Sequence, residues 1–183
     1  MATTCKLIAR QTLSSDTATV SFSSIPATYT DLLLLVSARS SNTDGFTAPV
    51  FMRFNGSNSN YSTRDLKSQR STAGFTVESS SNPYGVTSGI LIGECVGQNL
   101  TASTFSSHEV IVPNYAGSSN KSISTTAVSE NNGNSDYTFY IGSLAGLWSN
   151  TAAINEITLY AGNFGTFNFK SGSSFFLYGI TKA

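Results

Sequence analysis

Charged side chains are scarce in this sequence. Asp, Glu, Lys and Arg together make up 11% of its 183 residues, well under the roughly 25% of an ordinary soluble domain. The ten basic and ten acidic residues balance to a formal net charge of zero. A balanced chain has no long-range field of one sign that would attract a phosphate backbone or an acidic lipid surface. We therefore expect neither nucleic acid nor a membrane as a partner.

Histidine is almost absent, because His108 is the only one. A Ser-His-Asp site would need this residue beside a nucleophilic serine and an acid. Ser106 and Ser107 precede it directly, but no Gly-x-Ser-x-Gly motif occurs anywhere in the sequence. We expect His108 to be a structural histidine at the protein surface.

Cysteine is also rare, and the sequence lacks the usual metal-binding patterns. Cys5 and Cys95 are too far apart for a metal knuckle and too few for a disulfide framework, so we expect two buried free thiols. Zinc would lack ligands, and no loop has EF-hand spacing. Asp44, Glu130 and Asp136 each lie beside loops that contain Gly or Asn and leave open a single Ca²⁺ at a loop. We expect no metal and no cofactor.

Targeting and membrane segments are missing as well. The first residues, MATTCKLIAR, lack the apolar core of a signal peptide, so we expect synthesis in a cytosol. The uncharged stretch 137–155 contains too many Ser, Thr, Asn and Gly to supply the ~18 apolar residues of a membrane span. Glycoside hydrolysis would need two carboxylates across a cleft, but the acids are spread along the chain. We expect no enzyme.

Alternating apolar and polar residues run from end to end, which is the pattern of half-buried strands. The segment DLLLLVSAR instead has a continuous apolar run, 32–36, that predicts a central strand covered on both faces. About ten strands are expected. Their alternating residues include Val20 and Phe22, Val50 to Phe54, Phe75 and Val77, Ile90 and Ile92, Val110 and Val112, Ile123 to Ala127, Tyr137 to Ile141, Ile157 and Leu159, and a last strand ending at Ile180.

These strands predict an all-β fold, an antiparallel β-sandwich of jelly-roll type with two four-stranded sheets. An immunoglobulin-like sandwich is the alternative, although it usually closes in about 100 residues. We expect a single domain over residues 1–183, with residues 1–16 as a possible N-terminal arm. Apolar stripes with helical spacing are short throughout the sequence. At most one short helix could therefore form in each of the segments 63–70 and 144–153.

Two features suggest possible contact sites. Trp148, the only tryptophan, could form a sugar-stacking platform with Tyr140, Tyr160 and Tyr178, since aromatic rings present apolar faces with polar rims. The favoured alternative is that Trp148 plugs one end of the sandwich or a subunit interface. The sequence RFNGSNSNY supplies the second feature, a surface loop that we expect to be a solvated hairpin connection. Its loop residues are Asn55, Gly56, Asn58 and Asn60.

Three stretches resemble a pattern that recurs in virion structural proteins of tailed bacteriophages, including capsid decoration (cement) proteins. They are FSSIPATYTDLLLLVSARS (22–40), MRFNGSNSNYSTRDL (52–66) and GLWSNTAAINEITLYAGNFGTFNFKSGSSFFLYGI (146–180). In that pattern an Ile-Pro-x-x-Tyr turn leads into a long apolar strand, and the chain ends in Phe-x-Leu-Tyr-Gly-Ile. This chain has Thr63 and Arg64 where such proteins often place an aromatic residue and a histidine.

The resemblance implies a role without catalysis. It suggests a capsid decoration protein, made in the cytoplasm of a bacterial host, that binds the outer capsid surface of the virion and stabilises it. The major capsid protein and further copies of this chain, most simply in a homotrimer, would be its partners. The alternative is a tail-fibre or receptor-binding domain that recognises a host-surface glycan. A depolymerase is a weaker third reading.

Overall fold

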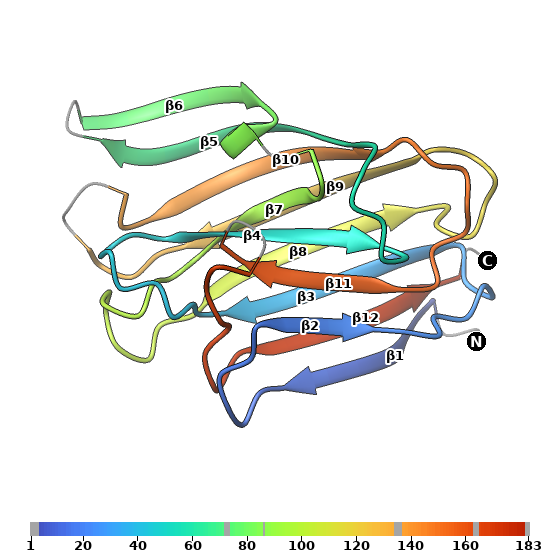
Figure 1. The fold of residues 1–183 in the computed structure, drawn as a ribbon, viewed down its shortest axis with the longest axis horizontal. Coiled ribbons are helices and arrows are strands. Elements are labelled where there is room, and N and C mark those ends of the chain that lie inside the picture. The colour runs from blue at the N-terminus through green and yellow to red at the C-terminus, as the bar shows by residue number, and fades with distance from the viewer. Residues whose placement is uncertain (1–3, 72–73, 86, 134–136, 163–164, 182–183) are drawn as a thin grey trace.

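The computed structural model describes residues 4–71, 74–85, 87–133, 137–162 and 165–181. Within these residues the chain forms 12 strands in two antiparallel sheets, which confirms the all-β sandwich. Figure 1 shows the two sheets face to face, with β5 and β6 at the top of the view and β1 at the bottom. The β-branched and aromatic residues that the sequence distributes at alternate positions suit this pleated, half-buried arrangement.

The larger sheet has eight strands and the smaller sheet has four. In spatial order, the larger sheet contains β1 (Cys5–Thr12), β12 (Ser174–Ile180), β3 (Asp31–Ala38), β8 (Ser106–Pro113), β9 (Lys121–Ser129), β10 (Tyr140–Trp148), β5 (Tyr61–Ser71) and β6 (Gly74–Ser81). The smaller sheet contains β2 (Thr19–Phe22), β11 (Ile157–Ala161), β4 (Ala48–Phe54) and β7 (Ile90–Cys95). The expectation of two four-stranded sheets was therefore wrong, and jelly-roll connectivity stays a prediction.

The start of the chain belongs to the larger sheet. Residues 5–12 form β1, which pairs with β12 in antiparallel register from Cys5 opposite Ile180 to Thr12 opposite Ser174. Half of the expected N-terminal arm, residues 1–16, is thus an edge strand whose backbone is hydrogen-bonded to β12. Residues 1–3 of that arm lie outside the described residues.

Both segments in which a short helix was expected contain strands instead. Residues 63–70 lie in β5, and residues 144–148 form the last part of β10. The two strands are paired with each other, from Ile141 opposite Ser68 to Trp148 opposite Tyr61. Among the described residues, the only helical element is the 3-10 turn η1 (Pro83–Gly85). Side chains of a strand alternate between its two faces, so every second residue of these segments can be buried, and this favours strand over helix here.

The register of β10 also differs from the expected one. The alternation of Tyr137, Phe139 and Ile141 predicted that these residues share one face, but the strand begins at Tyr140, which is buried, while Ile141 is exposed. Successive side chains of a strand point to opposite faces. The inward set of β10 therefore contains Tyr140, Leu144 and Trp148, and Ile141 belongs to the solvent side.

The main hydrophobic core lies between the two sheets. Leu34 and Val110 of the larger sheet share it with Met52 and Leu159 of the smaller sheet, and all four are fully buried. A second, smaller cluster of buried side chains packs where β7 approaches β9 and β10. It contains Phe51, Leu91, Ala127, Tyr140 and Leu144.

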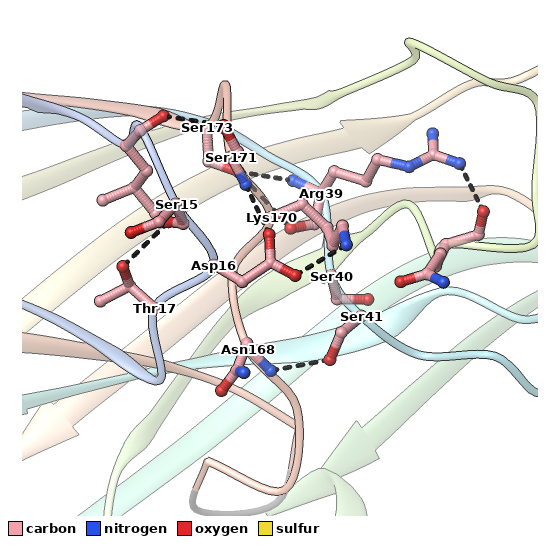
Figure 2. Close-up of polar contacts among 12 residues, drawn as sticks. Ser15, Asp16, Thr17, Arg39, Ser40, Ser41, Asn168, Lys170, Ser171 and Ser173 are labelled. Atoms are coloured by element: carbon pink, nitrogen blue, oxygen red, sulfur yellow. Dashed lines mark hydrogen bonds and ion pairs between the residues drawn. The ribbon is translucent and has the colours of Figure 1, made fainter.

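Polar contacts fasten two connections at one end of the sandwich (Figure 2). Asp16, between β1 and β2, accepts a hydrogen bond from the Ser171 backbone N–H at 3.0 Å and forms an ion pair of 2.7 Å with Lys170. Ser41 Oγ accepts a hydrogen bond from the Asn168 N–H at 2.9 Å. These groups join segments far apart in sequence, so the turn before β12 is tied to the segments that follow β1 and β3.

Candidate interaction surface

The central strands of the larger sheet alternate without interruption. In β8, β9 and β10 every second residue is buried in the sandwich, and the residues between them face outward. We call these outward residues of β8–β10 the outer face. They are Ser107, Glu109, Ile111 and Pro113 on β8, Ser122, Ser124, Thr126 and Val128 on β9, and Ile141, Ser143, Ala145 and Leu147 on β10.

The outer face is polar but almost without charge. Glu109 is its one charged side chain on the three strands, all of which the structure describes. The other residues of the outer face are hydroxyl-bearing Ser and Thr and aliphatic groups such as Ile141, which is 53% exposed. A surface of this composition offers hydrogen bonds and apolar contact without the desolvation cost of charged groups.

Strand register places the outward residues in rows across the sheet. Ser143 lies opposite both Leu66 of β5 and Thr126 of β9, and Thr126 lies opposite Glu109. The row continues across β3 and β12 through Leu35 and Phe176, which are partly exposed. The outward side of the sheet therefore continues beyond the outer face in both directions, where the flanking strands carry the exposed residues Arg64, opposite Ala145, and Arg10, opposite Phe176.

Two open depressions indent this side of the sheet. One, of about 270 Å³, lies over β3, β8 and β12 and is lined by Leu35, Glu109 and Phe176 among others. The other, of about 310 Å³, lies over β5, β9 and β10 and includes Leu66 and Ile141. Apolar side chains of a partner could seat in both, so the face suits broad contact with another protein surface.

His108 lies inside the sandwich, and the expectation of a surface histidine was wrong. It occupies an inward position of β8 and is 1% exposed. Its Nε2 lies 3.2 Å from the Glu94 carbonyl oxygen, and burial lowers the pKa of the imidazole to about 4. His108 is therefore neutral near pH 7. Neither Ser106 nor Ser107 hydrogen-bonds to it, since Ser106 Oγ donates to the Ala38 carbonyl and Ser107 faces outward.

The cysteines divide between two environments. Both are free thiols, as expected, but only Cys95 is buried, whereas Cys5 is exposed on the edge strand β1. Burial raises the pKa of the Cys95 thiol to about 12, so this thiol stays protonated and packs in the main core.

The acids considered for a loop Ca²⁺ do not form a site among the described residues. Asp44 and Glu130 are exposed in separate loops, and Asp136 lies outside the described residues. Glu130 instead accepts a hydrogen bond from the Asn132 N–H at 2.6 Å. In the part of the chain that the structure describes, no group of three or more His, Cys, Asp or Glu side chains is placed to hold a metal ion.

Trp148 is packed inside the sandwich rather than arranged as a sugar-stacking platform. It is 1% exposed, and its ring stacks on Tyr61 with centroids 6.0 Å apart and lies 5.6 Å from the Phe54 ring. The proposed neighbours lie elsewhere. Tyr140 belongs to the second cluster, Tyr160 lies under the Arg53 guanidinium at 4.9 Å, and Tyr178 is on the outward side of β12.

Within RFNGSNSNY, residues 55–60 form a surface loop as expected, but this loop is not a hairpin connection. It carries the chain from β4 in the smaller sheet to β5 in the larger one. Asn55, with a positive φ of 52°, fixes this crossing. Its Nδ2 donates to the Ala153 carbonyl at 2.8 Å, and its Oδ1 accepts from the Asn155 N–H at 2.9 Å. Gly56, Asn58 and Asn60 follow in the same surface loop.

Sequence reasoning missed the outward pair Leu66 and Ile141 and the buried residue Glu94. Placing the pair outward required recognising β5 as a strand, for Leu66, and the correct start of β10, for Ile141. Glu94 follows a buried apolar run and is itself only 3% exposed, so no alternation pattern distinguishes it.

Comparison with known proteins adds no family. No protein-family model matches the sequence, and no curated protein matches it. Among the described residues there is no helix with the length and apolar character needed to cross a membrane.

Proposed function

We propose that this protein is a virion structural protein of a tailed bacteriophage, and specifically a capsid decoration protein. It is made in the bacterial cytoplasm, binds the outside of the assembled shell through contacts with the major capsid protein, and stabilises that shell. The proposal joins the sequence resemblance to the outer face described above. It assigns no catalytic step to the chain.

The composition of the outer face is the observation that carries the proposal. Its twelve positions on β8–β10 hold one charge, at Glu109. Many copies with such surfaces can lie side by side without mutual repulsion. Each contact can be weak, because neighbouring engagements on one shell raise the effective concentration of the next.

Stabilisation would follow from selective binding. A ligand that binds the assembled shell and not its separated subunits shifts the equilibrium toward the shell by mass action. We propose a homotrimer as the bound form, since cyclic symmetry lets one surface patch of each copy meet an equivalent site at a three-fold point.

The proposal is tested with heads of the parent phage assembled without this protein. Adding the purified protein should raise the rupture temperature of mature heads, which is measured by the fluorescence of a dye that binds the released DNA. Thr126→Lys places a charge at the centre of the outer face and should abolish the gain. Thr19→Lys, on the exposed side of β2 in the smaller sheet, should leave it intact. Unchanged rupture at saturating wild-type protein would contradict the proposal.

A further inference from the structure

A bulge in the edge strand β7 turns Glu94 away from the main core. Pro49 lies opposite Glu94 and Phe51 opposite Leu91, so β7 has one more residue than β4 between these pairs. Strict alternation would place Glu94 on the same face as Ile90 and Ile92. The extra residue shifts the pattern, and Cys95 joins that core face instead. Bulges of this kind often re-aim a side chain.

Gly93 makes the bulge possible. Its φ of 121° is rarely adopted by residues with a side chain, and a Cβ there would lie 2.3 Å from the Ala127 Cβ on the facing strand β9. Only glycine allows both the backbone conformation and the close approach. The position of Glu94 is therefore built into the packing of β7 against the larger sheet.

The Glu94 carboxylate is buried but not fully used. It is 3% exposed. Thr47 Oγ1 donates a hydrogen bond to Oε2, and the Tyr84 hydroxyl donates one to Oε1. A carboxylate has about four acceptor positions, so each oxygen can accept a further hydrogen bond from a ligand. Desolvation of the hydroxyl group and the negative charge of Glu94 raise the pKa of Tyr84, which keeps this hydroxyl protonated as a donor.

Three exposed aromatic rings surround this carboxylate. Phe46, Tyr84 and Tyr137 are 43%, 46% and 42% exposed. They come from separate segments, namely the residues before β4, the turn η1 and the residues before β10. Phe46 and Tyr137 meet edge to face with centroids 5.7 Å apart, and Tyr84 contacts Phe51 of the second cluster at 6.3 Å.

Two of these rings are held on backbone that is unfavourable for bulky residues. Tyr84 has a φ of 65° and Tyr137 a φ of 57°. Such conformations cost on the order of 1 kcal/mol or more and persist where surrounding contacts impose them, often at binding sites. The rings are thus positioned by the fold and are not incidental exposure of single loop residues.

Together these groups line one concave pocket of about 270 Å³, which we call the Glu94 pocket. This volume lies just under the ~300 to 1,000 Å³ of sites for drug-sized molecules, so a ligand with one six-membered ring is the appropriate size. The lining residues are Phe46, Thr47, Pro49, Lys67, Tyr84, Glu94 and Tyr137.

The wall of the pocket favours a neutral ligand over a cation. Aromatic rings around a carboxylate could hold an ammonium group, but Lys67 also lines the pocket, and its Nζ lies 6.0 Å from the centroid of the Tyr84 ring. The two charged lining residues, Glu94 and Lys67, balance each other, so the pocket has no net charge that would attract a cation. A neutral ligand with several hydroxyl groups can instead donate hydrogen bonds to Glu94 and place an apolar ring face on an aromatic ring.

We propose that the Glu94 pocket binds a neutral sugar ring, free or at the end of a glycan. Glu94 accepts hydrogen bonds from the hydroxyl groups of the sugar, and the exposed aromatic rings contact the apolar face of the sugar ring. The site contains none of the outer-face residues, although Lys67 also lines the depression over β5, β9 and β10, and it does not depend on the proposed role at the capsid. Trp148 takes no part in it.

The test is a titration of the isotope-labelled full chain with individual sugars, followed by ¹H–¹⁵N correlation spectra. The probes are D-glucose, D-galactose, D-mannose, L-rhamnose and N-acetyl-D-glucosamine, each up to its solubility limit, with choline chloride as the cationic probe. At least one sugar should shift the amide signals of Thr47, Glu94 and Tyr137, with a Kd in the millimolar range typical of a single ring.

Two substitutions localise the binding. Tyr137→Ala removes an exposed ring and should weaken binding of that sugar roughly tenfold. Glu94→Gln removes the charge with little change of shape and should also weaken binding roughly tenfold. Tyr178→Ala removes a partly exposed tyrosine from β12 and should leave the affinity unchanged.

Three results would overturn the proposal. One is the absence of shifts with all five sugars, and another is binding of choline alone. The third is sugar binding that survives Tyr137→Ala, a change at an exposed residue for which folding is readily confirmed from the same spectra.

Discussion

The outer face and the Glu94 pocket are both exposed, yet they are built in opposite ways. The outer face consists of short hydroxyl and aliphatic side chains spread over neighbouring strands, with one charge at its surface. The pocket is concave, gathers large aromatic rings and keeps its carboxylate buried. The first arrangement suits contact with a broad protein surface, and the second suits one small ligand.

The difference originates in strand regularity. In β8, β9 and β10 every second residue is buried, so the residues between them face outward and form the outer face. The pocket exists because β7 breaks that alternation at Gly93. A regular sheet therefore supplies an extended surface, and a local irregularity supplies a specific site.

The largest expected effect comes from the core that supports both regions. Trp148→Ala should lower the free energy of unfolding by ~3 to 5 kcal/mol, because it leaves a cavity beside Tyr61 and Phe54. Leu147→Ala, one residue earlier on the outward side of β10, should cost about 1 kcal/mol or less. Urea denaturation followed by circular dichroism measures both. Equal losses for the two variants would contradict the assigned faces of β10.

The next effect tests the residue that joins the two regions. His108 lies on β8, beneath the outer face, and contacts the backbone of Glu94. Burial lowers its pKa from the ordinary 6.5 to about 4. As the pH falls from 6.5 toward 4, the unfolded chain takes up a proton that the folded chain does not, so stability decreases, by up to about 3 kcal/mol from this group.

The measurement is the unfolding free energy across that pH window for the wild type and for His108→Gln. The variant lacks the titrating imidazole, so its stability should fall less between pH 6.5 and 4 than that of the wild type. Parallel pH profiles would show that His108 is not held neutral by the fold.

A smaller effect compares two glutamates directly, one in each region. Glu94→Gln replaces an acceptor of two hydroxyl hydrogen bonds by a group with one acceptor, and should cost ~1 to 3 kcal/mol of stability. Glu109→Gln changes an exposed residue of the outer face and should stay within about 0.5 kcal/mol. Thermal unfolding at neutral pH distinguishes them. A larger loss of stability for Glu109→Gln than for Glu94→Gln would contradict the assignment of Glu94 as the buried, hydrogen-bonded carboxylate.

The regular part of the fold was predictable, and the irregular part was not. Alternating apolar residues such as Val110 and Val112, or Ile123 and Ala127, placed β8 and β9 correctly because each such strand buries one face. In β10 the same reasoning assigned Ile141 to the wrong face, since Tyr137 and Phe139 precede the strand rather than belong to it. Periodicity gives the existence of a strand more readily than its boundary.

The pocket could not have been predicted from local patterns. Phe46, Tyr84 and Tyr137 are far apart in sequence, and only the pairing of β4 with β7 and the placement of η1 bring them around Glu94. The division into eight and four strands likewise depends on long-range pairing, as in β1 with β12. A possible signal was Gly93 within the run ILIGEC, since an isolated glycine in a strand often marks a bulge.

The central claim is that the outer face of the larger sheet adheres to an assembled shell. Electron cryomicroscopy of the intact virion, at a resolution that places individual strands, tests it most directly. The account predicts density for this protein outside the capsid, with β8, β9 and β10 turned toward the major capsid protein or a neighbouring copy. Density only at the tip of a tail fibre, or on the capsid with that side of the sheet open to solvent, would contradict it.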